Sequence, residues 1–311
     1  MRAFLFPGQG SQAVGMGRDL AAASAVARQT LEEVDDALGQ KLSVLMAEGP
    51  EADLTLTANA QPAIMANAIA TLRVMQREGG LRLTDRAQAL AGHSLGEYSA
   101  LCAGESFDLA TTARLLRVRG DAMQAAVPVG EGAMAALLGA DIAAAQALCD
   151  AAAEGEVLAV ANDNDPTQVV ISGHAAAVER AIAIAKDNGI RRAVKLPVSA
   201  PFHSPLMQPA ADAMRDALAK HRPQAPLIPI WANVTASPES DPARIADLLV
   251  EQVTGRVRWR ETIAAMWEAG VTDFVEVGGK VLGPMVKRIA PDASVTSVVT
   301  MADIEQIAKE W

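Results

Sequence analysis

The stretch Ala89-Leu90-Ala91-Gly92-His93-Ser94-Leu95-Gly96-Glu97 decides the interpretation of this chain. A short apolar run ends there in the pattern Gly-x-Ser-x-Gly, and a helix-like segment follows. Small residues on both sides of a serine permit a sharp, strained turn between a strand and a helix, which exposes the serine hydroxyl at the helix N-terminus. The pattern therefore predicts a nucleophilic Ser94, although five common residues can also match it by chance.

The composition indicates the size of the core and the kind of partner. The chain has 311 residues, of which 50% are hydrophobic and 3% aromatic, enough for a large aliphatic core and one smaller domain. The formal net charge of -10 argues against nucleic acid as the main partner, because a phosphate-binding surface needs excess Lys and Arg.

The cysteines and the apolar segments predict a cytoplasmic protein. Cys102 and Cys149 show no CxxC spacing, so we expect two reduced thiols and neither a disulfide nor a metal site. The apolar run in Met1–Pro7 is too short for a signal peptide. No apolar segment approaches the ~20 residues of a membrane span, so no membrane contact is expected.

Predicted strands alternate with predicted helices along most of the chain. Ala3–Phe6 is typical of a buried strand, and helices are predicted over Asp19–Leu38 and, with a proline near the first turn, over Ala63–Arg77. This alternation indicates an α/β fold with a mainly parallel sheet that is covered on both faces. We expect a large α/β-hydrolase-like catalytic domain formed by residues 1–128 and 198–311.

Residues 129–197 have an order of elements of their own. Strands and helices follow one another as βαββαβ, the order of a ferredoxin-like subdomain, here predicted as an insertion. Within it Val157–Ala161 and Gln168–Ser172 are predicted strands, and Asn162–Pro166 is the predicted turn between them.

A serine nucleophile needs a base, and the sequence offers four histidines. His203 is the best candidate, because prolines on both sides place it in a loop or at a helix start. His174 and His221 lie in contexts that predict solvated side chains, and the side chain of His93 should point away from that of Ser94. No acidic residue stands out as the partner of the second ring nitrogen, so a backbone carbonyl would complete a Ser–His dyad.

Several segments together carry a resemblance that none carries alone. The chain closely resembles the malonyl-CoA:acyl-carrier-protein transacylases of type II fatty acid synthesis, from about residue 3 to residue 290. The motifs in their order are Phe6-Pro7-Gly8-Gln9-Gly10-Ser11-Gln12, Gly92-His93-Ser94-Leu95-Gly96-Glu97, Arg119-Gly120, Ser199-Ala200-Pro201-Phe202-His203-Ser204, Gln252 with Val257-Arg258-Trp259, and Glu276-Val277-Gly278-Gly279-Lys280-Val281-Leu282. One departure is the loop at Gly278-Gly279, where relatives usually carry an extra residue.

The resemblance implies a catalytic machinery. Ser94 matches the nucleophile and His203 the general base and acid. Gln252 matches the residue whose backbone carbonyl holds the histidine ring, which accounts for the missing acidic partner. Gln9 and Leu95 match the residues whose backbone N–H groups form the oxyanion hole.

The resemblance also implies the substrate contacts. Arg119 matches the arginine that pairs with the free carboxylate of the malonyl group, a role that suits a planar guanidinium. Phe202 stands where a bulky ring would favour malonyl over branched acyl groups. Gln61 and Asn162 resemble residues that line the pocket.

The implied reaction is a ping-pong transfer of malonyl from malonyl-CoA to acyl carrier protein, through an ester on Ser94. No cofactor and no metal are expected, because the coenzyme A thioester is a substrate and the partner carries the phosphopantetheine. Carrier proteins are acidic, so the basic cluster Lys280, Lys287 and Arg288 is a candidate docking surface, although it could equally be ordinary solvated charge. A monomer is expected.

Three other functions remain open at this point. The acyltransferase subunit of malonate decarboxylase shares these motifs. A serine esterase or thioesterase on a hydrolase-like sheet would use the same serine, but Arg119 and the missing acidic residue count against it. A catalytically silent carrier-binding scaffold is disfavoured by the intact Ser94, His203 and Arg119.

Overall fold

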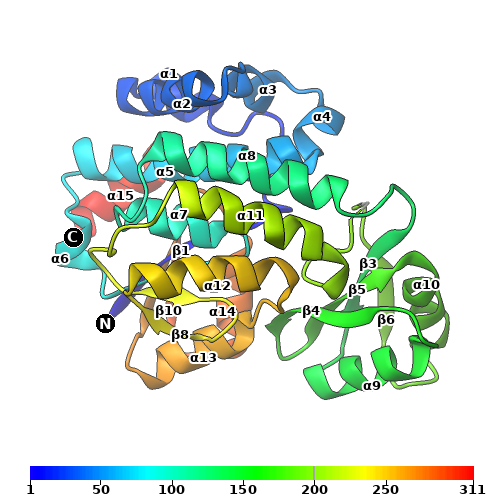
Figure 1. Ribbon diagram of the computed structural model, residues 1–311. Coiled ribbons are helices and arrows are strands. Elements are labelled where there is room, and N and C mark those ends of the chain that lie inside the picture. The colour runs from blue at the N-terminus through cyan, green and yellow to red at the C-terminus, as the bar shows by residue number, and fades with distance from the viewer. Residues whose placement is uncertain (199) are drawn as a thin grey trace.

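A computed structural model describes residues 1–198 and 200–311, and Ser199, part of the histidine motif, lies outside the described residues. Two sheets with flanking helices make up the described chain (Figure 1). It is therefore a mixed α/β protein with one mainly parallel sheet and one antiparallel sheet, as the alternation of elements predicts.

The larger sheet has the strand order β10-β9-β1-β2-β7-β8. All neighbouring strands run parallel except β8, which pairs antiparallel with β7. In the register of the two central strands Phe6 lies beside Gly92, so the loops that follow β1 and β2 leave the same edge of the sheet. The strands are β1 (Arg2–Phe6), β2 (Ala89–Gly92), β7 (Ile230–Ala232), β8 (Ser237–Glu239), β9 (Asp273–Val277) and β10 (Ser294–Val298).

Both faces of this sheet are buried. This agrees with the almost continuous apolar sequence of β1, which has no polar face to present to water. Phe4 and Phe6 of β1 belong to the core on one face, and Leu5 belongs with Trp259 to the core on the other. The helices of this part are α1 (Arg18–Ala23), α2 (Ala25–Leu38), α3 (Leu42–Glu48), α4 (Glu51–Thr55), α5 (Thr57–Arg77), α6 (Leu83–Arg86), α7 (Gly96–Ala103), α8 (Leu109–Ala125), the 3₁₀ turn Pro205–Met207, α11 (Gln208–Lys220), α12 (Pro242–Thr254), α13 (Trp259–Glu268), α14 (Leu282–Ile289) and α15 (Met301–Glu310).

The smaller sheet lies beside the large one and is built from one continuous segment (Figure 1). Its strand order is β4-β5-β3-β6, and every pair is antiparallel. The elements follow one another in the predicted order. They are β3 (Gly132–Leu138), α9 (Ile142–Ala152), β4 (Leu158–Asp165), β5 (Gln168–His174), α10 (Ala175–Ile184) and β6 (Arg192–Lys195).

The prediction of one continuous helix over Asp19–Leu38 is wrong, because the structure divides this segment into α1 and α2 at Ser24. Ser24 has an extended backbone, its Oγ accepts a hydrogen bond from Ala27 N at 3.1 Å, and it donates to Glu78 Oε1 at 2.6 Å. A serine that caps the next helix and also donates a hydrogen bond to a carboxylate far away in the chain can interrupt an otherwise helical pattern.

The predicted start of the next helix is also wrong. Helix α5 begins at Thr57 and contains Pro62, rather than beginning at Ala63. The extra turn packs tightly on α8, since a Cβ atom on Gly120 would lie 2.7 Å from Ala58 Cα. This close helix contact stabilises a turn that the proline alone would disfavour.

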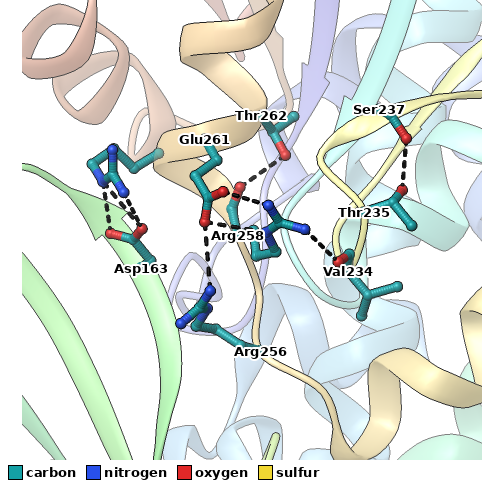
Figure 2. Close-up of polar contacts among 9 residues, drawn as sticks. Asp163, Val234, Thr235, Ser237, Arg256, Arg258, Glu261 and Thr262 are labelled. Carbon is teal, nitrogen blue, oxygen red and sulfur yellow. Dashed lines mark hydrogen bonds and ion pairs between the residues drawn. The ribbon is translucent and has the colours of Figure 1, made fainter. Parts of the chain in front are cut away.

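The prediction of a turn at Asn162–Pro166 is also wrong, because strand β4 continues through Asp165. Two ion pairs hold the polar end of β4 against helices α13 and α14. Asp163 accepts from Arg260 Nε and Nη2, the latter at 2.8 Å, and Asp165 accepts from Arg288 Nε at 2.7 Å (Figure 2 shows Asp163 and its ion pair). Buried carboxylates with such partners make a turn-like composition compatible with a strand.

In the described ranges, no helix combines the length and the apolar character needed to cross a membrane.

Gly92 offers a direct test of this fold. A Cβ atom there would lie 1.8 Å from the backbone oxygen of Gly96, so neither side chain nor rotamer change can relieve the clash. We expect Gly92→Ala to lower the free energy of unfolding by about 3 kcal/mol or more, measured by urea denaturation. Gly104→Ala is the control, because the nearest atoms to its Cβ lie at 3.3 Å and its φ is -82°. Equal stability of Gly92→Ala and the parent would contradict the tight elbow.

Candidate active site

The turn between β2 and α7 places Ser94 in a strained backbone conformation. Its φ is +54°, in the left-handed region that non-glycine residues rarely adopt. The two glycines of the motif are required, since a Cβ on Gly96 would lie 2.2 Å from Phe6 O, and Gly92 has no more room. Asn233 holds the turn by accepting from Ser94 N at 2.7 Å and donating to the oxygen of Gly92 at 2.7 Å.

Ser94 and His203 meet, as the sequence predicts. Ser94 Oγ lies 2.8 Å from His203 Nε2, although the two residues are 109 positions apart. His203 Nδ1 faces two backbone carbonyls, of Gln252 at 2.8 Å and of Gly255 at 3.1 Å. Because carbonyls only accept, Nδ1 carries the proton and Nε2 is free to accept the proton of the serine hydroxyl.

The environment of His203 keeps its ring neutral. Burial, followed by the positive charge of Arg119, lowers the pKa of His203 to about 3. His203 itself has a φ of +55°, and the loop that carries it is tied by a hydrogen bond of 2.7 Å from Ser204 Oγ to Pro201 O. A neutral, fixed imidazole is the form that can act as a general base.

Arg119 lies on the inner side of α8 with 1% of its surface exposed. Its Nη1 donates to Gln61 Oε1 at 2.8 Å, and its Nη2 donates to Gln252 Oε1 at 2.8 Å and to Ser94 Oγ at 3.1 Å. No carboxylate within the described ranges forms an ion pair with it, and its Nε has no hydrogen-bond partner there. A buried guanidinium held only by neutral groups favours an incoming anion.

A cavity of about 360 Å³ opens onto these groups. Its wall combines Ser94, His203 and Arg119 with residues of the smaller sheet, among them Asn162 and Val170. The site thus lies between the two sheets, and both contribute to it. Phe202, Gln61 and Gln9 also line this cavity.

The two predicted oxyanion donors, Gln9 and Leu95, lie in the loops that follow β1 and β2. Gln9 follows β1 in the loop that lines the cavity, and a Cβ on its neighbour Gly8 would lie 2.6 Å from His93 O. Leu95 directly follows Ser94 and is the residue before the first turn of α7. Neither backbone N–H is hydrogen-bonded to another group in residues 1–198 or 200–311, so both are free to bind an oxygen atom.

The three cations of the predicted docking cluster, Lys280, Lys287 and Arg288, differ in their surroundings. Lys280 is exposed, and Val281, the next residue, lines the cavity. Lys287 Nζ donates to the carbonyl of Ala293 at 2.6 Å, and Arg288 pairs with Asp165. The latter two cations therefore have structural partners of their own, which the sequence does not reveal.

No role was predicted from the sequence for three buried residues that the structure places around the site, Glu97, Asn164 and Asn233. The carboxylate of Glu97 accepts from Gln252 Nε2 at 2.7 Å and from Asn233 N at 3.1 Å. Asn164 Oδ1 lies 2.8 Å from Nε2 of His93, which lines the cavity beside Ser94. Glu97 lies at the end of the Gly-x-Ser-x-Gly stretch and Asn233 directly follows β7, but neither position reveals a partner far away in the chain.

Among the described residues no group of three or more His, Cys, Asp or Glu side chains could hold a metal ion.

Comparisons with known proteins agree with this geometry. The acyl transferase domain family matches residues 3–285. The malonyl CoA-acyl carrier protein transacylase of Escherichia coli strain K12 is 46% identical over 289 residues, covering 92% of each chain. The enzyme of the same name from Bacillus subtilis strain 168 is 44% identical and covers 92% of this chain and 90% of its own.

Solved structures show the same similarity. The acyl-carrier-protein S-malonyltransferase of Bartonella henselae is 54% identical, with a TM-score of 0.97 over 99% of this chain and 98% of its own. A malonyl-transacylase solved in complex with a type II polyketide synthase acyl carrier protein is 40% identical, with a TM-score of 0.95 over 100% and 99% of the two chains.

The low pKa of His203 predicts how Ser94 reacts as the pH changes. A base acts in its neutral form, and a pKa of about 3 keeps the ring neutral from pH 8 down to about pH 5. We expect phenylmethylsulfonyl fluoride to label Ser94 at rates that change less than about threefold between pH 7 and pH 5, measured by intact-protein mass spectrometry. Ser94→Ala should stay unlabelled. A fall in rate centred near pH 6.5 would mean an ordinary, solvated histidine.

Proposed function

We propose, since the chain belongs to the malonyl CoA-acyl carrier protein transacylases of the acyl transferase family, that it transfers malonyl groups from malonyl-CoA to the phosphopantetheine thiol of an acyl carrier protein. This reaction supplies fatty acid biosynthesis. The observation that carries the proposal is the buried guanidinium of Arg119, whose Nη2 lies 3.1 Å from Ser94 Oγ in the same cavity.

The first half of the reaction loads the serine. Ser94 Oγ attacks the carbonyl carbon of the thioester while its proton passes to His203 Nε2. The N–H groups of Gln9 and Leu95 stabilise the tetrahedral oxyanion, at about 3 kcal/mol for each donor in comparable sites. The carbon–sulfur bond then breaks, and His203 returns its proton to the departing coenzyme A thiolate.

The second half of the reaction removes the malonyl group from Ser94. The phosphopantetheine thiol of the carrier gives its proton to His203 and attacks the ester carbonyl on Ser94. The same two N–H groups hold the second oxyanion. When the carbon–oxygen bond breaks, the proton on His203 returns to Ser94 Oγ, which restores the free enzyme. Enclosure of the ester between the two sheets limits attack by water.

Substrate selection rests on the charge of Arg119. The malonyl carboxylate would pair with this guanidinium, whose direction is fixed by Gln61 and by the side chain of Gln252. Phe202 would restrict the space beside His203 and so disfavour branched acyl groups, and Asn162 would contact the acyl group from the smaller sheet.

Several finer features belong to the same proposal. The larger sheet would be α/β-hydrolase-like over residues 1–128 and 198–311, and residues 129–197 would form a ferredoxin-like subdomain, as supported by the strand order β4-β5-β3-β6. A cytoplasmic monomer that uses no cofactor is expected. The malonate decarboxylase subunit and the serine esterase are less well supported, because the similar chains are transacylases.

Mass spectrometry after incubation with malonyl-CoA tests the function. We expect a malonyl adduct on Ser94 that is absent in Ser94→Ala. Because the carboxylate needs the guanidinium, Arg119→Ala should lower kcat/KM for malonyl loading at least about 100-fold, and Arg119→Lys should recover only part of it. If Arg119→Ala loads malonyl as efficiently as the parent, the assignment of the carboxylate partner is wrong.

Carrier docking needs its own test. Of the three cations of the predicted cluster, Lys280 is the cleanest probe, because Lys287 and Arg288 have structural partners whose loss would complicate the result. We expect Lys280→Glu to raise KM for the acidic carrier about fivefold with little change in kcat. Lys186→Glu, an equal charge change in the smaller sheet unit, serves as the control. An equal KM for both variants and the parent would exclude Lys280 from docking.

A further inference from the structure

We propose that Glu97 is a positioning residue that sets the acyl selectivity of this site. Its carboxylate fixes the side-chain amide of Gln252, and this amide in turn holds the guanidinium of Arg119 where an acyl carboxylate can reach it. The inference rests on the proposed function, because it concerns the same malonyl site.

Glu97 lies in the first turn of α7 with 3% of its surface exposed. Its Oε2 accepts from Gln252 Nε2 at 2.7 Å and from Asn233 N at 3.1 Å, and within the described chain it forms no ion pair with Lys or Arg. Burial raises its pKa to about 7, against the opposing effect of these hydrogen bonds. A carboxyl group buried at this cost, behind the residues that line the cavity, points to a positioning role.

Two acceptors fix the direction of the Gln252 amide, Glu97 Oε2 at 2.7 Å from Nε2 and the backbone oxygen of Ser94 at 3.1 Å. A carboxylate oxygen accepts hydrogen bonds, so it draws the NH₂ end of the amide toward itself. The oxygen end then faces Arg119 Nη2 at 2.8 Å. With the amide reversed, its NH₂ group would face the guanidinium donors, and neither side would have an acceptor. Protonation of one carboxyl oxygen leaves the other able to accept, so the arrangement survives both ionisation states.

The catalytic pair depends on Gln252 through a different atom. His203 Nδ1 bonds the backbone carbonyl of Gln252, which is fixed by helix α12 and not by the side chain. Loss of the Glu97 acceptor leaves the amide with its longer hydrogen bond to Ser94 O, at 3.1 Å, and so loosens its hold on Arg119 while the contact between Ser94 and His203 stays in place. The expected result is a loss of selectivity for the charged acyl group, without a matching loss of serine reactivity.

The test compares loading of Ser94 from malonyl-CoA and from acetyl-CoA, which lacks the carboxylate. We expect Glu97→Ala to raise KM for malonyl-CoA about tenfold and to change acetyl loading less than about twofold. Glu97→Gln keeps an acceptor oxygen and should restore the malonyl preference to within about twofold of the parent. If Glu97→Ala fails to fold, Glu97→Met fills the same volume without an acceptor and should show the same selective loss.

Glu276→Gln is the matched control, because this carboxylate is equally buried but accepts from the N–H groups of Leu282 and Gly283 at the start of α14. It should lower the melting temperature without changing the ratio of malonyl to acetyl loading. An equal loss with both substrates in Glu97→Ala, or an unchanged ratio, would overturn the role of Glu97. A parent protein that does not load malonyl at all would instead overturn the proposed function.

Discussion

The buried positive charge of Arg119, 3.1 Å from Ser94 Oγ, is the constraint on which the site depends. Burial of a guanidinium costs several kcal/mol unless it is paired and hydrogen-bonded. Here the partners are the neutral amides of Gln61 and Gln252, which satisfy individual N–H groups but supply no negative charge. Among the described residues no carboxylate pairs directly with this cation, so an anionic acyl group would supply the missing partner.

The same charge acts on His203, the proposed general base. Arg119 is the second cause, after burial, of the low pKa of His203. When a carboxylate pairs with the guanidinium, its negative charge offsets this effect, and the pKa of His203 rises toward the range in which imidazole is an effective base. A substrate with the correct charge would thus make His203 a stronger base beside Ser94. A neutral acyl group would bind without this gain.

The sequence predicts the local parts of this protein better than their long-range partners. The alternation of strands and helices, the turn at Ser94 and the loop histidine follow from glycines, prolines and apolar periodicity within short segments. The break at Ser24 and the extension of β4 through Asp165 depend instead on Glu78 and Arg288, far away in the chain. Likewise no local pattern could show that Glu97, Asn233 and Gln252 meet in one hydrogen-bond network.

The histidine is oriented by carbonyls, and the charge of Arg119 gives a reason. An aspartate placed beside His203 Nδ1, as in a serine hydrolase triad, would add a negative charge within the field of the guanidinium. The two would attract each other, and the cavity would lose affinity for an acyl carboxylate. Backbone carbonyls of Gln252 and Gly255 fix the same tautomer without a net charge. The carboxylate of Glu97 is separated from Arg119 by the amide of Gln252, so it forms no ion pair with the guanidinium, whose Nε has no hydrogen-bond partner among the described residues.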